Sequence, residues 1–139
     1  MSPDGPALGV MIGAEGAQIA ALQRAHAPIP RPLQVRGLID SAADLTAVAP
    51  RVLHQLGVIP AARVSTLTAA GSIHVNLFKV SLTISGPKGA AGPMLVRSTL
   101  LVSELATALP SIEALIGLDI LTECLFGIDG PGEHFLLGF

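Results

Sequence analysis

The sequence predicts a single, mainly β domain with one or two short helices, and three observations support this fold class. Apolar runs are short and are separated by scattered Gly and Pro residues, as in chains with many short strands. One segment alternates strictly between apolar and polar residues, and only two segments carry convincing helix boundaries. The length of 139 residues fits one domain covering residues 1–139, which can bury a core without disulfides or metal.

Strands account for most of the expected elements. The clearest is residues 78–85, where Phe78, Val80, Leu82 and Ile84 alternate with polar residues, which predicts a strand with one solvated face. Residues 86–89 form a turn after it. Further strands are expected at residues 8–12, 33–39, 94–102 and 134–139.

Helices are expected at two places. Residues 50–56 begin with Pro50 and are followed by Gly57, the usual arrangement of proline at a helix start and glycine beyond its end. Residues 118–124 form the second candidate. Residues 18–25 fit a helix and a strand equally well, and the prolines of residues 28–32 predict an extended connector.

The composition indicates either a membrane protein or an oligomer. Apolar residues make up 50% of the chain, aromatic residues only 3%, and the mean hydropathy is +0.65. A spanning helix needs roughly 20 apolar residues in a row, and Glu104, Pro110, Glu113 and Asp119 interrupt the longest apolar segments. The first six residues include Asp4 and no basic residue, unlike a secretory signal. We therefore expect a cytoplasmic protein without a membrane partner that buries apolar surface between subunits.

Several other functions are disfavoured. A net charge of −2, 13% charged residues and no basic run argue against nucleic-acid binding. The four histidines are too widely spaced for a metal site, the glycine-rich residues 86–92 lack phosphate-loop spacing, and no cofactor is expected. Cys124 is the only cysteine, so there is no intrachain disulfide, and its apolar neighbours predict a core residue.

The most informative segment is Gly37-Leu38-Ile39-Asp40-Ser41-Ala42-Ala43-Asp44, in which a carboxylate follows an apolar strand directly. One interpretation is an aspartate that caps a turn through its own side chain. The other is a carboxylate at the mouth of a buried strand, where functional groups with perturbed pKa values are found.

This segment resembles the hydrophobic-hydrophobic-Asp-Thr/Ser-Gly-Ala signature of aspartic peptidases. Residues 114–121, Ala-Leu-Ile-Gly-Leu-Asp-Ile-Leu, look like the second signature of the retropepsin-like branch, which is apolar-apolar-Gly-Arg-Asp/Asn followed by a short helix. A glycine-containing hairpin candidate at residues 69–72 lies at the place of the flap. Residues 126–130 and 135–139 look like the last strands of small bacterial single-domain members, so the resemblance covers nearly the whole chain.

The resemblance implies a closed retropepsin-like β-barrel, a two-fold homodimer and aspartic endopeptidase activity on a peptide or protein substrate. Such enzymes place two carboxylates around one water, and the pair shares a proton because two close negative charges cannot both persist. One carboxylate activates the water and the other polarises the scissile carbonyl. The chain has only one such segment, so Asp40 would be catalytic and its partner copy would supply the second carboxylate.

The remaining roles also follow from the resemblance. Ser41, Ala42 and Ala43 would form the active-site loop, with the Ser41 hydroxyl bonding across the pair of loops. The substrate-binding residues would be Asp44 beside the loop and Ala70, Gly71 and Ser72 at the flap.

Two positions depart from the family pattern. Ala42 replaces the signature glycine, and its methyl group could displace the carboxylate, where an error of about 1 Å can cost on the order of 100-fold in rate. Leu118 replaces an arginine that usually pairs with acidic groups near the active loop. A second hypothesis is therefore a catalytically weak or inactive dimer of the same fold that acts as a peptide-binding or interaction module.

Overall fold

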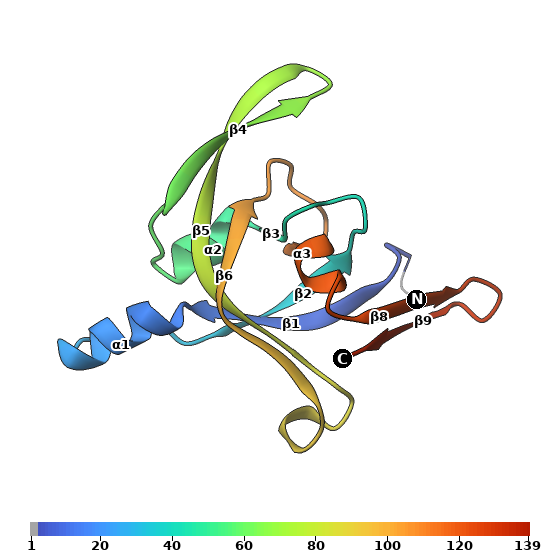
Figure 1. Ribbon diagram of the computed structural model, residues 1–139, viewed down its shortest axis with the longest axis horizontal. Helices are drawn as coiled ribbons and strands as arrows, with labels where there is room; N and C mark the ends of the chain where they lie inside the picture. Colours follow the sequence, from blue (N-terminus) through green and yellow to red (C-terminus); the bar gives the residue numbers. More distant parts are fainter. Residues whose placement is uncertain (1–2) are drawn as a thin grey trace.

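The computed structural model describes residues 3–139, and within that range six strands close a β-barrel. The strands follow one another around the barrel in the order β1-β2-β7-β3-β6-β5, and β5 pairs back onto β1 (Figure 1). Their bounds are β1 Ala7–Ala14, β2 Leu33–Ile39, β3 Ala47–Val48, β5 Gly71–Ser85, β6 Met94–Glu104 and β7 Ala114–Ile116. The expected mainly β fold class is confirmed.

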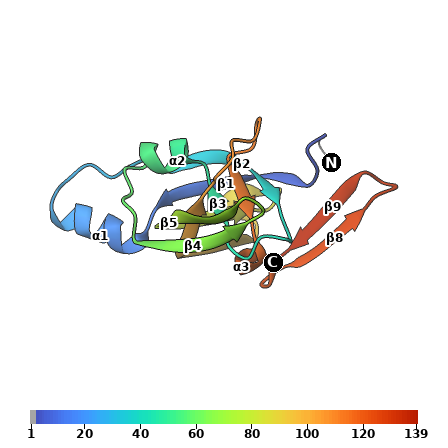
Figure 2. The same cartoon turned by 90° about the horizontal axis from the view of Figure 1, so that it is seen from above.

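Two hairpins extend beyond the barrel. β4 (Ala62–Thr68) pairs antiparallel with the first part of β5, and together they rise from one end of the barrel (Figure 1). β8 (Leu125–Asp129) and β9 (His134–Gly138) form a separate two-stranded ribbon. Both views place this ribbon on the opposite side of the molecule from helix α1 (Gly16–Arg24) (Figure 2).

The barrel interior is mainly aliphatic, because the chain has few aromatic residues. Phe78, Val80, Leu82 and Ile84 of β5 are all buried, while Lys79 on the other face is exposed. Helix α2 (Pro50–Gln55) adds Val52 and Leu53 to the same core. Each such side chain, fully buried, contributes about 1.5–3 kcal/mol of transfer free energy. Because only one face of β5 is buried, its apolar residues alternate with polar ones, and this alternation made the strand recognisable in the sequence.

The expected helices are present, and both are shorter than predicted. Pro50 begins α2, and Gly57 follows it at φ +67°, a conformation that favours glycine. Residues 18–25 fall largely within α1, which resolves the ambiguity in favour of a helix. Helix α3 covers only Leu118–Leu121, because the chain then turns into β8. Among residues 3–139, no helix has the length and apolar character needed to cross a bilayer.

Candidate active site

Asp40 lies at the end of a pair of parallel strands in the barrel wall. β2 pairs with β7 over Gly37 to Ile39, and the Asp40 N–H donates to the Ile116 carbonyl at 3.0 Å. The Asp40 Oδ1 accepts the Ala42 N–H at 3.0 Å, and its carbonyl accepts the Ala43 N–H at 3.2 Å. The turn-capping interpretation of Asp40 is therefore confirmed, and this turn fixes the carboxylate in space at the strand end.

The two sequence segments that resemble family signatures lie side by side. The loop of residues 40–46, here called the Asp40 loop, packs against the start of α3. The Leu118 N–H donates to the Ala43 carbonyl at 2.8 Å, and the Asp119 N–H donates to the Asp44 carbonyl at 3.2 Å. The parallel pairing of β2 with β7 thus brings together residues that are more than 70 positions apart.

Thr46 and Asp119 join these segments through their side chains. The Thr46 hydroxyl donates to Asp119 Oδ1 at 2.7 Å and accepts the Gly117 N–H at 3.2 Å, while the Thr46 N–H donates to Asp119 Oδ2 at 3.0 Å. Thr46 is completely buried, the one buried polar side chain among the described residues. Sequence reasoning placed Asp119 within the second signature-like segment but missed Thr46, whose signal is a hydroxyl followed by the apolar residues 47–49.

Gly117 allows this close packing. A Cβ atom at this position would lie 2.7–2.9 Å from the backbone of Ala43 and Leu45, closer than side-chain carbons approach backbone atoms. The glycine of the second signature therefore has a direct steric cause: any larger residue would push the Asp40 loop away from β7.

A groove of about 410 Å³ runs between the Asp40 loop and the β4–β5 hairpin. This hairpin groove is lined by Ala43, Asp44, Leu45, Ala47, Val64, Thr66, Thr68, Ile73, Val75, Leu77, Ser103, Glu104, Leu105, Ala106 and Leu115. The volume lies within the range of ligand pockets, roughly 300–1,000 Å³. Val64 pairs with Val75 and Thr66 with Ile73, so one face of the hairpin forms the roof. Asp40 is not a lining residue, although Ala43 and Asp44 are.

The flap-like hairpin expected at residues 69–72 is present. Thr68 pairs with Gly71 across a two-residue turn, and the Thr68 hydroxyl donates to the Gly71 carbonyl at 2.8 Å. Gly71 has φ +116°, which only glycine adopts readily. Ala70, Gly71 and Ser72 are exposed at the tip and do not line the groove; their role in binding stays a prediction.

The two departures from the family pattern cause no strain in the folded chain. Ala42 is exposed and does not have positive φ, so this turn does not require glycine. Leu118 is 37% exposed at the start of α3. Ser41 is also exposed, and its expected bond across a pair of loops stays a prediction.

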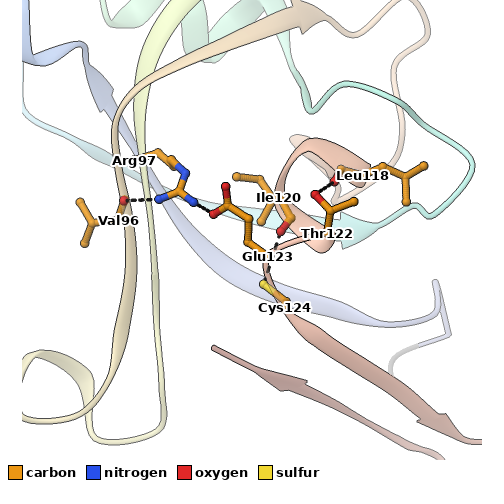
Figure 3. A network of polar contacts seen from close by, with 7 residues as sticks. All are labelled: Val96, Arg97, Leu118, Ile120, Thr122, Glu123 and Cys124. Atoms are coloured by element: carbon orange, nitrogen blue, oxygen red, sulfur yellow. Dashed lines mark hydrogen bonds and ion pairs between the residues drawn. The ribbon is translucent and has the colours of Figure 1, made fainter.

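Cys124 lies outside this site, in the segment that leads from α3 to β8 (Figure 3). It packs against the barrel core, and its thiol donates to the Ile120 carbonyl at 3.5 Å. Burial raises the pKa of the Cys124 thiol, an effect partly offset by the nearby Arg97, which forms an ion pair with Glu123. Cys124 therefore packs against the core but is only partly buried, not a full core residue, and a protonated thiol is a poor nucleophile.

Among the described residues, the histidines join no metal site, and Asp129 has a structural role in a turn. No group of three or more His, Cys, Asp or Glu side chains in the described part of the chain could bind a metal ion. The Asp129 carboxylate accepts the Gly132 N–H at 3.0 Å in the β8–β9 turn.

Comparisons with known proteins add no family assignment. No protein-family model matches the chain, and no curated protein is significantly similar to it.

Proposed function

We propose that this chain is one half of an aspartic endopeptidase, in which Asp40 residues from two copies act on one water molecule. The observation that carries the proposal is the fixed position of Asp40, at a strand end on the loop that borders a largely apolar groove beneath the β4–β5 hairpin. A retropepsin-like barrel with a flap provides the same combination of parts.

The second carboxylate is expected from a partner copy because the sequence contains only one segment of the Asp40-Ser41 type. Both oxygens of Asp119 accept hydrogen bonds from Thr46, so this carboxylate stabilises the fold. A two-fold axis beside Asp40 would pair identical side chains. Exposed apolar residues, among them Leu118, Leu125 and Leu136, are compatible with a subunit interface.

The chemistry needs no cofactor. One ionised Asp40 accepts a proton from the water, whose oxygen adds to the scissile carbonyl carbon, while the protonated Asp40 donates to the carbonyl oxygen. Transfer of a proton to the leaving nitrogen then separates a carboxylic acid from an amine. An extended peptide under the hairpin could use strand-like hydrogen bonds for its alignment.

The test is peptide hydrolysis at mildly acidic pH by the parent chain and by Asp40→Asn. The expected result is loss of hydrolysis by at least about 1,000-fold on removal of the general base, in line with the largest effects of general acid–base groups. Asp4→Asn removes a carboxylate that does not line the groove and serves as the matched control. Hydrolysis by Asp40→Asn at the parent rate would refute the mechanism.

The alternative function is a peptide-binding or interaction module with little or no catalysis, favoured by Ala42 in the active-site loop and by the exposed Leu118. Ala42→Gly separates the two. A parent that cleaves as fast as Ala42→Gly supports the peptidase. If neither chain cleaves and both bind extended peptides, the binding module is correct.

A further inference from the structure

The hairpin groove carries two carboxylates and no cation. Asp44 and Glu104 are its only charged lining residues. Neither forms an ion pair within residues 3–139, whereas four acidic residues elsewhere do: Asp4, Glu113, Glu123 and Asp129. The groove therefore presents uncompensated negative charge to whatever enters it.

Glu104 is the better placed of the two carboxylates to recognise a ligand. It is half-buried at the end of β6, and its Oε1 accepts the Asn76 N–H at 3.4 Å. Asn76 adjoins Leu77, where the hairpin leaves the barrel, so this contact holds the carboxylate where the groove meets a second hollow, which His54 also lines. Electrostatic attraction is stronger in such a partly dehydrated place than in bulk water.

The walls of the groove suit the stem of a long basic side chain. Val64, Ile73 and Val75 supply aliphatic surface along the roof, which leads from the open edge towards Glu104. Lysine and arginine pack their methylene stems on such surfaces while the charged group reaches a polar partner. A neutral or acidic side chain would displace water from the Glu104 carboxylate without supplying a positive charge to replace it, which is unfavourable.

We propose that the groove selects peptides carrying a Lys or Arg whose charged group pairs with Glu104. Asp44, on the Asp40 loop, adds to the negative potential from a different element. This inference rests on the proposed peptidase function and deepens it by naming the class of substrate. Pairing of this kind weakens as salt screens the two charges.

The test uses three fluorescein-labelled peptides that share one aliphatic sequence and differ at a single position, which is Lys, Gln or Glu. Binding is measured by fluorescence anisotropy with Asp40→Asn, so that no peptide is consumed, and kcat/KM is measured with the parent. We expect the Lys peptide to be preferred over the Gln peptide by about five-fold, the upper range for a partly exposed ion pair. Glu104→Gln should abolish this preference, and Glu104→Lys should transfer it to the Glu peptide.

Glu15→Gln is the matched control, because it removes one carboxylate that does not line the groove. Equal binding of the three peptides, or a preference unchanged by Glu104→Gln, overturns the inference while leaving hydrolysis intact. A Lys preference in binding without hydrolysis by the parent supports the inference and overturns the peptidase function. Absence of binding by all three peptides also overturns the inference.

Discussion

At the scale of single residues, Asp40 is held both by neighbours in sequence and by a neighbour in space. Its carboxylate position is fixed by Ala42 and its backbone by Ile116 on β7. The Asp40 loop is in turn connected to α3 by Thr46 and Asp119, two residues 73 positions apart. Thr46 therefore anchors the end of the Asp40 loop to α3.

Thr46→Val should destabilise the protein more than a comparable change elsewhere. The substitution keeps the shape but removes the hydroxyl that bonds Asp119 and Gly117, which should cost about 1–3 kcal/mol for a buried partner left unsatisfied. Thr122→Val is the matched control, since its exposed hydroxyl bonds only the Leu118 carbonyl. Urea denaturation measures both, and equal losses of stability would contradict the role of Thr46.

Cys124 gives a prediction about pH. Because burial raises the pKa of its thiol, the thiolate forms at higher pH in the folded chain than in the unfolded chain. The midpoint of the iodoacetamide alkylation rate, followed by mass spectrometry, should move to higher pH on folding. Arg97→Gln should move it further in the same direction, because Arg97 lowers this pKa. Coincident midpoints for folded and urea-unfolded chains would contradict the burial argument.

At the scale of elements, the sequence predicted β5 and α2, whose apolar residues are buried in the core. The alternation of residues 78–85 was readable because one face of β5 is buried, and α2 was readable from Pro50 and Gly57. β4 has no such pattern, since all of its residues are exposed. The Thr46–Asp119 contact was unpredictable from local sequence, because it exists only once β2 and β7 pair. Asp40 and the hairpin tip were located in the sequence, whereas the roles of the residues around them remain predictions.

Gly71→Ala should affect the hairpin without unfolding the barrel. The φ of +116° at Gly71 is unfavourable for alanine by roughly 1–2 kcal/mol, and the tip is exposed and far from the core. We expect faster amide hydrogen exchange in residues 62–77, an almost unchanged melting temperature and a lower kcat/KM. Ala70→Gly, at the same turn, is the control. A loss of global stability equal to that of Thr46→Val would contradict the independence of the hairpin.

At the scale of the whole molecule, the chain combines a closed barrel with a candidate site that, under the proposed function, needs a second carboxylate. The barrel leaves β4 and the β8–β9 ribbon outside its closed set of strands, and the ribbon carries exposed Leu125 (68%) and Leu136 (59%). Apolar surface of this kind accounts for part of the high mean hydropathy of the chain. An assembly of two copies would give the site its second carboxylate.

The most direct test of paired Asp40 residues is a mixing experiment. Parent chain and Asp40→Asn are unfolded together, refolded at constant total concentration and assayed for peptide hydrolysis. If two Asp40 carboxylates are required, only dimers of two parent chains are active, and an equal mixture should retain about a quarter of the parent activity. Activity that falls in proportion to the parent fraction, to about half in the equal mixture, would show that one Asp40 suffices and would contradict the shared site.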